Sequence, residues 1–163
     1  MVPIYKNKGD IQSCTNYRGI KLMSHTMKLW GRVIEHRLRG TTRVSTNQFG
    51  FMPGRSTIEA IFLIRQVTER FREQKKDLHM VFIDLEKTYD KIPRNVMWWA
   101  LDKNKVPTKY VTLIKDMYNN AVTSVRTNDG NTDYFPIEIG LHQGSALSPY
   151  LFALVMDEVT RDI

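Results

Sequence analysis

The feature that most constrains this chain is an apolar run, Val81-Phe82-Ile83, that ends on a single carboxylate, Asp84. The apolar residues are continuous rather than alternating, which is typical of a strand covered on both faces of a sheet. The pattern therefore predicts a buried strand over residues 78–85, with Asp84 at its end. Phosphoryl-transfer enzymes hold Mg²⁺ with carboxylates on rigid elements that face a cleft, so Asp84 is a candidate metal ligand.

Composition bounds the class of protein. Hydrophobic residues make up 42% of the 163 residues, which is enough for the core of one domain. The single cysteine, Cys14, excludes an internal disulfide and indicates a reducing compartment. No apolar run approaches the roughly 20 residues of a membrane span, and the amino terminus lacks the apolar segment of a signal peptide. We expect a soluble, intracellular protein without a membrane partner, and the sequence defines neither a nuclear nor a cytoplasmic location and no oligomeric state.

Charge is divided unevenly along the chain. Residues 1–76 carry 15 Lys and Arg against 5 Asp and Glu, whereas residues 77–163 carry 9 against 12. A basic lobe beside an acidic locus suits an enzyme that holds nucleic-acid phosphates with one part and a metal ion with the other. A solvated, lysine-rich surface would have the same composition, so both interpretations stay open on charge alone.

Turn signals and apolar periodicity predict an α+β fold. One hairpin is expected from residues 2–5 and 17–22, and a second from residues 121–127 and 132–139. Helices are expected to begin at capping residues or prolines, namely Ser24, Ser56 or Thr57, Pro93, Pro107 and Ser148-Pro149.

For two of these helices, the sequence also predicts where one ends and which face of the other is apolar. Gly40 is the expected stop of the first helix. The second helix is expected to present one apolar face, formed by Ala60, Leu63, Ile64, Val67 and Phe71.

Other polar residues near Asp84 allow alternatives. Asp90 lies six positions further on, and a cap or turn carboxylate before Pro93 is the favoured interpretation for it. The loop over residues 140–149 has two glycines, whose backbone can approach a ligand closely together with the Gln143 amide. One interpretation makes His142 a general base, but a solvent-exposed loop histidine is the favoured interpretation.

Four blocks, in order along nearly the whole chain, resemble the reverse transcriptase domain of non-long-terminal-repeat retrotransposons, the type widespread in plant genomes. They are Asn16-Tyr17-Arg18-Gly19-Ile20 within residues 2–22, Gln48-Phe49-Gly50-Phe51-Met52-Pro53-Gly54-Arg55-Ser56, Phe82-Ile83-Asp84-Leu85-Glu86-Lys87-Thr88-Tyr89-Asp90, and residues 140–152. The resemblance implies a partial right-hand polymerase fold. The fingers would comprise approximately residues 1–76 and 104–141, and an incomplete palm approximately residues 77–103 and 142–163.

The resemblance also implies roles for individual residues. Asp84 matches the catalytic aspartate that bridges both Mg²⁺ ions of a two-metal site, and Leu85 would offer its backbone carbonyl to one of them. The expected partners are an RNA template, a DNA primer and a deoxynucleoside triphosphate.

Further positions match residues that hold the nucleotide. Tyr89 matches the aromatic gate that stacks under the sugar and excludes a 2′-hydroxyl, and Gln143 matches a glutamine that borders the nucleotide and template. Arg18 aligns with an arginine on the triphosphate, and either Lys6 or Lys8 aligns with its neighbouring lysine. Cations at these positions would offset triphosphate charge.

The sequence also departs from the family pattern. Members place an aromatic-Ala-Asp-Asp hairpin after the helix that begins near Ser148, but this chain has no Asp-Asp pair. Asp157 and Glu158 are not expected to replace it, because a metal site demands defined ligand geometry and one of the two is expected to be a solvent-facing charge. Gly19 replaces a common proline. The thumb is also absent, so we interpret the chain as a truncated domain.

Two functions therefore remain. The first is an RNA-directed DNA polymerase domain whose 163-residue segment has negligible activity alone, because one aspartate does not complete a two-metal site. The second is a basic, non-catalytic module that binds nucleic-acid phosphates. Because the chain lacks the Asp-Asp hairpin that would pair with it, the strand over residues 78–85 is expected to present an open edge.

Overall fold

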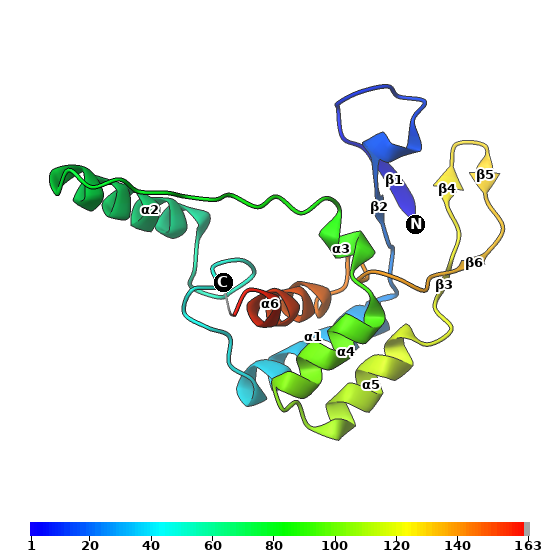
Figure 1. The fold of residues 1–163 in the computed structure, drawn as a ribbon. Coiled ribbons are helices and arrows are strands. Elements are labelled where there is room, and N and C mark those ends of the chain that lie inside the picture. Colours follow the sequence, from blue (N-terminus) through cyan, green and yellow to red (C-terminus); the bar gives the residue numbers. More distant parts are fainter. Residues whose placement is uncertain (162–163) are drawn as a thin grey trace.

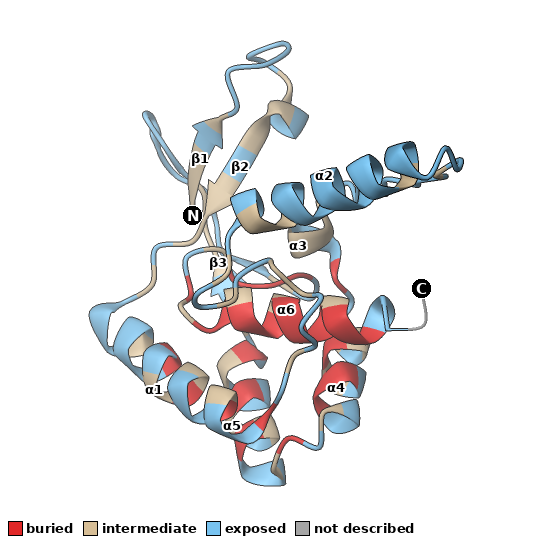
Figure 2. Ribbon diagram, turned by 90° about the vertical axis from the view of Figure 1, so that its left-hand side faces the viewer, coloured by how far each residue is buried: buried red, intermediate tan, exposed pale blue. Residues whose placement is uncertain are grey.

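The computed structural model describes residues 1–161. Four helices gather on one side of the molecule, α1 (His25–Thr41), α4 (Arg94–Lys103), α5 (Thr108–Tyr118) and α6 (Ser148–Val159) (Figure 1). Buried residues concentrate on α6 and on the faces of the helices around it (Figure 2). These four helices therefore form the hydrophobic core of the molecule.

The core depends on α6 because this helix is apolar almost all round. Leu151, Ala153 and Leu154 are completely buried. The helix packs against α4, which contributes Ala100 and Leu101 to the same cluster. A helix that is hydrophobic on every side is stable only when other elements surround it, which accounts for the central position of α6.

The predicted helix starts are confirmed. The Ser24 hydroxyl accepts a hydrogen bond from the Met27 amide, and the Ser56 hydroxyl accepts one from the Glu59 amide at the start of α2 (Thr57–Glu73). Pro93 and Pro107 precede α4 and α5, as expected.

The expected stop at Gly40 is wrong by one residue. Helix α1 continues to Thr41, where both Thr41 and Thr42 donate their side-chain hydroxyls to the Leu38 carbonyl. These hydrogen bonds satisfy a carbonyl of the last turn, so the helix does not need a glycine to end.

Both predicted hairpins are confirmed. Strand β1 (Val2–Tyr5) pairs with β2 (Tyr17–Ile20) in antiparallel register, and a short 3-10 turn, Cys14–Asn16, precedes β2. In the second hairpin, β3 (Val122–Thr123) pairs with β6 (Phe135–Pro136), and β4 (Arg126–Thr127) pairs with β5 (Gly130–Asn131). The predicted mixture of helices and strands is thus correct.

The two hairpins are joined at the amino terminus. The terminal ammonium of Met1 donates to the Ser124 carbonyl at 2.6 Å, and the Arg126 amide donates to the Met1 carbonyl at 2.9 Å. These bonds place β1 beside β4, away from the helical core (Figure 1).

The predicted buried strand over residues 78–85 is wrong. Residues 77–85 are irregular, and the side chains of Val81, Phe82 and Ile83 are 86%, 76% and 69% exposed. A strand requires a hydrogen-bonded neighbour, and none pairs with this segment within residues 1–161. The apolar run indicated a preference for burial, but the local pattern could not supply a partner.

The predicted apolar face of α2 forms, but it is not buried. No residue of α2 is buried, and Leu63 and Val67 are 44% and 46% exposed. The helix projects away from the four core helices, and residues 77–85 lead back from it to the core (Figure 1). The spacing of apolar residues correctly predicted the helix, but it could not predict whether another element would cover the apolar face.

Among the helices of residues 1–161, none combines the length and the apolar character that crossing a bilayer requires.

Candidate functional site

A cleft of about 610 Å³ lies between the first hairpin, the loop before α2 and the short helix α3 (Thr88–Lys91). All four motif blocks contribute to it. Its lining comprises Lys6, Tyr17 and Arg18 from the hairpin, Phe51 from the loop, Ile83, Asp84, Leu85, Lys87, Thr88, Tyr89 and Asp90 from the segment around α3, and Gln143 and Phe152 from the last block.

The structure brings six of the seven predicted site residues to this cleft, which are Lys6, Arg18, Asp84, Leu85, Tyr89 and Gln143. Lys8 is the exception, because it lies in the exposed turn between β1 and β2 and does not line the cleft. The sequence left Lys6 and Lys8 as alternatives, and the geometry favours Lys6.

The hairpin supplies the cationic wall of the cleft. Arg18 lies opposite Ile4 in the register of β1 and β2. The Lys6 ammonium donates to the Thr15 carbonyl at 3.0 Å, which holds its side chain across the hairpin. Two cations from one hairpin, Arg18 on β2 and Lys6 directly after β1, suit a ligand that carries several negative charges.

Asp84 and Leu85 reach the cleft from the exposed segment before α3. Lys87, the residue directly before α3, has a left-handed backbone, at φ 51°. A non-glycine residue in this region costs roughly 1–2 kcal/mol, so this turn is sustained by its surroundings. The turn lies between Asp84 and Tyr89, and both residues line the same cleft.

Three aromatic rings cluster in the lining that also contains Asp84. The Tyr89 ring lies 5.4 Å from that of Phe152 and 6.4 Å from that of Phe51, and Phe51 meets Phe152 edge-on at 5.8 Å. Burial raises the pKa of the Tyr89 phenol above its usual value, so this group stays neutral at physiological pH. The Tyr89 ring is thus one member of a three-ring cluster, in contact with both phenylalanines.

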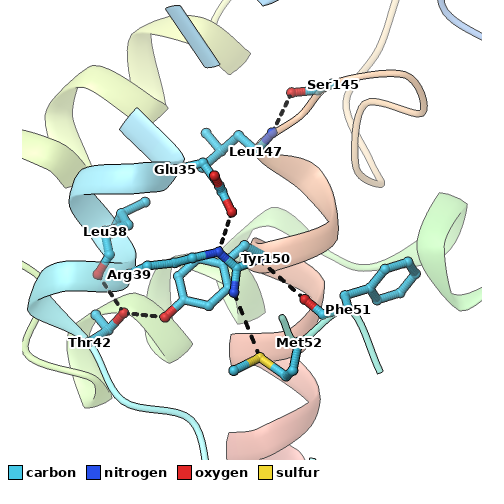
Figure 3. Close-up of polar contacts among 9 residues, drawn as sticks. All are labelled: Glu35, Leu38, Arg39, Thr42, Phe51, Met52, Ser145, Leu147 and Tyr150. Atoms are coloured by element: carbon cyan, nitrogen blue, oxygen red, sulfur yellow. Dashed lines mark hydrogen bonds and ion pairs between the residues drawn. The ribbon is translucent and has the colours of Figure 1, made fainter. Parts of the chain in front are cut away.

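Arg39, which the sequence analysis did not identify, holds the loop that carries Phe51 (Figure 3). Its guanidinium donates to the Phe51 carbonyl at 3.2 Å, pairs with Glu35 and lies 4.0 Å over the Tyr150 ring. The Tyr150 hydroxyl in turn bonds Thr42 at 2.6 Å. The Glu35/Arg39 spacing signalled an ion pair on one helix face, but nothing local indicated the contact with Phe51.

Two glycines fix the loop that carries Gln143. At Gly140, which has φ +78°, an added Cβ would lie 2.2 Å from the Asp90 carbonyl oxygen. At Gly144, with φ +99°, it would lie 2.6 Å from the Lys21 carbonyl oxygen. The loop is therefore held between α3 and the end of β2 at distances that only glycine permits.

His142 does not behave as either sequence interpretation expected. It is buried, and its ring stacks on Tyr118 with centroids 4.2 Å apart. Burial, reinforced by the nearby cations Lys21 and Arg94, lowers the pKa of His142 to about 4. It does not line the cleft, so it is neither a solvated loop residue nor a candidate base there.

Asp90 lies in the cleft, where its Oδ1 accepts a hydrogen bond from Gln143 Nε2 at 2.6 Å. The sequence favoured a cap or turn role for Asp90 and gave no sign of this contact. The two residues are 53 positions apart, and no local pattern connects them.

The expectation that one of the two carboxylates of α6 faces the solvent is wrong, because neither does. Asp157 and Glu158 are 4% and 8% exposed. Asp157 accepts from the Ser45 amide at 3.1 Å, while Glu158 accepts from the Asn104 side chain at 2.9 Å and pairs with Arg161. Buried carboxylates need such partners, and these two tie α6 to neighbouring segments rather than to the cleft.

The donors in the cleft fit a metal ion that is shared with a ligand. Within residues 1–161, no group of three or more His, Cys, Asp or Glu side chains is placed to hold a metal. The cleft offers the carboxylates of Asp84 and Asp90, together with Leu85. Mg²⁺ usually takes one or two carboxylates and completes its shell with water and substrate phosphates.

The fold and the cleft define a mixed helix-and-strand domain suited to a phosphate-bearing ligand. The chain belongs to the reverse transcriptase (RNA-dependent DNA polymerase) family, whose model matches residues 4–163.

Curated relatives agree with this membership. The chain is 27% identical over 152 residues to the "Retrovirus-related Pol polyprotein from type-1 retrotransposable element R2" of Popillia japonica, covering 93% of this chain and 21% of that protein. It is 30% identical over 156 residues to the "Probable RNA-directed DNA polymerase from transposon BS" of Drosophila melanogaster, covering 93% and 17%. The predicted resemblance to reverse transcriptases of non-long-terminal-repeat retrotransposons is confirmed. The chain spans about a fifth of these relatives or less.

Proposed function

We propose that this chain is the nucleotide-binding part of an RNA-directed DNA polymerase, comprising fingers at approximately residues 1–76 and 104–141 and part of the palm at approximately residues 77–103 and 142–163. The observation that carries the proposal is one cleft lined by all four motif blocks. Residues separated by more than a hundred positions, such as Arg18 and Gln143, share this cleft, as a common ligand would require.

The ligand proposed for the cleft is a deoxynucleoside triphosphate, with RNA as template and DNA as primer. Lys6 and Arg18 on the hairpin wall offset the charge of the triphosphate. Tyr89, which packs against Phe51 and Phe152, lies under the sugar and excludes a 2′-hydroxyl. Gln143 borders the nucleotide from the opposite loop.

Asp84 and the Leu85 carbonyl are the groups proposed to hold Mg²⁺ together with the nucleotide phosphates. When bound, the metal would polarise the phosphoryl oxygens as a Lewis acid. The chain contributes a carboxylate on an exposed segment that lines the same cleft as Lys6 and Arg18. Since the sequence contains no Asp-Asp pair, we expect nucleotide binding, but not primer extension, from these 163 residues.

Calorimetric titration with dATP and MgCl₂ tests the proposal. We expect Mg²⁺-dependent binding that Asp84→Asn abolishes and that Arg18→Ala weakens about tenfold or more, because charge-assisted hydrogen bonds are removed. Lys6→Ala should weaken binding, whereas Lys8→Ala, outside the cleft, is the matched control. Binding that is indifferent to Asp84 and Arg18 would contradict the proposal.

A second candidate function is a non-catalytic module that binds nucleic-acid phosphates. It is favoured by the basic first half of the chain, with 15 Lys and Arg against 5 Asp and Glu in residues 1–76. Salt-sensitive RNA binding without any Mg²⁺-dependent dATP binding would support this candidate over the first. Primer extension that Asp84→Asn abolishes would exclude it.

A further inference from the structure

Arg39 connects the helical core to the loop that carries Phe51, although Arg39 does not itself line the cleft. Its guanidinium pairs with Glu35 one turn earlier on α1 and lies 4.0 Å over the Tyr150 ring of α6 (Figure 3). Both of these partners belong to core helices. They hold the guanidinium in place, so its hydrogen bond to the Phe51 carbonyl, at 3.2 Å, ties the loop to the core.

The backbone of Phe51 needs such a contact. Its φ is 59°, in the left-handed region that favours glycine because a Cβ atom is crowded there. The loop over residues 42–56 contains turns but no helix or strand. Within residues 1–161, the bond from Arg39 is the only hydrogen bond that the Phe51 backbone makes. A strained residue keeps its conformation only where its surroundings hold it, and Arg39 is the polar group that does so.

The Phe51 ring is what this loop contributes to the aromatic cluster. It meets the Tyr89 ring at 6.4 Å and 52°, and it meets the Phe152 ring edge-on at 5.8 Å. Phe152 is carried by α6 in the core, whereas Phe51 is only as fixed as its loop. An aromatic ring excludes a hydroxyl group only as far as the ring resists displacement. The anchoring of Phe51 therefore contributes to the resistance of Tyr89.

We infer that Arg39 is a positioning residue, which keeps the Phe51 ring against Tyr89 and thereby sets how strongly the cleft prefers a deoxynucleotide to a ribonucleotide. The inference rests on the proposed function of the cleft, in which Tyr89 lies under the sugar. It assigns Arg39 an effect on the selection of the sugar that passes through two aromatic rings, without contact between Arg39 and the nucleotide.

The test compares the binding of dATP and ATP, each with MgCl₂, by calorimetry on the 163-residue chain. The wild-type chain should bind dATP more tightly. Arg39→Met keeps an apolar stem over the Tyr150 ring but removes the donors, so the loop can relax and the Tyr89 ring can yield. ATP should then bind more tightly, while the affinity for dATP changes by less than about twofold. The preference for dATP should fall about three- to tenfold, the equivalent of one net hydrogen bond.

Two further variants separate this role from support of the fold. Phe51→Gly removes the ring and relieves the left-handed backbone without touching the core helices, so it gives a result even where Arg39→Met destabilises the chain. It should lower the preference as Arg39→Met does, and adding Arg39→Met to it should change the preference no further. Arg37→Met, which removes an exposed cation of the same helix outside the cleft, is the matched control and should leave the preference unchanged.

Each outcome decides a different point. A dATP preference that persists in Arg39→Met and in Phe51→Gly would overturn the inference while leaving the proposed nucleotide binding intact. Equal weakening of dATP and ATP by Arg39→Met would show that Arg39 only supports the fold, and would overturn it as well. Equal binding of the two nucleotides by the wild-type chain would refute both the selection of the sugar by Tyr89 and this inference. Binding of neither nucleotide by the wild-type chain would overturn the proposed function itself.

Discussion

At the scale of single residues, close backbone approach decides the geometry of the cleft. Gly140 and Gly54 have nearly the same left-handed backbone, with φ +78° and +75°. Around Gly54, an added Cβ would meet no atom within 4 Å, whereas at Gly140 it would overlap the Asp90 carbonyl. Comparing substitutions at the two glycines therefore separates the free-energy cost of a left-handed side-chain-bearing residue from the cost of steric overlap.

We expect Gly54→Ala to lower the free energy of unfolding by roughly 1–2 kcal/mol, the cost of a left-handed alanine. Gly140→Ala should cost clearly more, because the loop must also move away from α3. Urea denaturation of the two variants checks this. Equal destabilisation would show that the loop is not held against Asp90.

His142 makes stability depend on pH. Its pKa is about 4 in the folded chain and about 6.5 in the unfolded chain, so between these values the unfolded state binds more protons. The contribution of His142 to stability is therefore complete above pH 6.5 and falls by roughly 3 kcal/mol as the pH drops to about 4. Below about pH 4 it changes no further.

His142→Phe should remove this component while keeping an aromatic ring against Tyr118. Free energies of unfolding at pH 7 and pH 4.5, measured for the wild-type and variant chains, isolate it from the titration of other groups. Identical pH dependence in the two chains would contradict the assignment.

At the scale of elements, α6 and α2 are both regular helices, but only α6 has its apolar face covered by other parts of the chain. Leu151 on α6 is completely buried, whereas Leu63 on α2 is 44% exposed. Both residues belong to apolar faces of correctly predicted helices. Capping side chains and apolar spacing act within a few residues, so a sequence reveals them, but the neighbour that covers a face comes from elsewhere in the chain.

Leu151→Ala should cost about 2–5 kcal/mol of unfolding free energy, because it leaves a cavity in the core. Leu63→Ala on α2 should change the free energy by less than about 0.5 kcal/mol, as for other surface substitutions. Thermal and urea unfolding of both variants measures the contrast. A large destabilisation by Leu63→Ala would indicate that the face of α2 is covered in solution.

At the scale of the whole molecule, basic residues lie around the cleft as well as in it. A second hollow, lined by Lys28 and Arg32 of α1, adjoins it, and Tyr89 lines both. Nucleic acid that reaches the cleft would pass these two cations, so we expect them to contribute to phosphate binding.

Binding of single-stranded RNA should weaken as salt rises. Replacing both Lys28 and Arg32 by glutamine should reduce the slope of log K against log salt by up to about 1.4, or about 0.7 for each phosphate that is no longer neutralised. The control is the double variant Lys103→Gln with Lys109→Gln, which makes the same charge change on the exposed surface of α4 and α5. Its salt dependence of RNA binding should stay close to that of the wild-type chain. Equal slopes for the two double variants would show that the charge acts without regard to position.

The residues alone were sufficient for the family, the helix starts and both hairpins, and six of the seven candidate site residues line one cleft. These features rest on interactions between near neighbours or on motif blocks that stay intact along the chain, as at Ser24, Ser56 and the register of β1 with β2. The buried strand was not correctly predicted, because an apolar run specifies a preference for burial and not the partner that provides it.

Long-range packing settled the rest. It placed Lys6 rather than Lys8 in the cleft, buried His142 against Tyr118, and set Asp90 against Gln143. Each outcome depends on the distance between residues far apart in the chain, which is set by how the helices and hairpins pack together. Asp84 indicated a cleft from the sequence, and folding determined which side chains surround it.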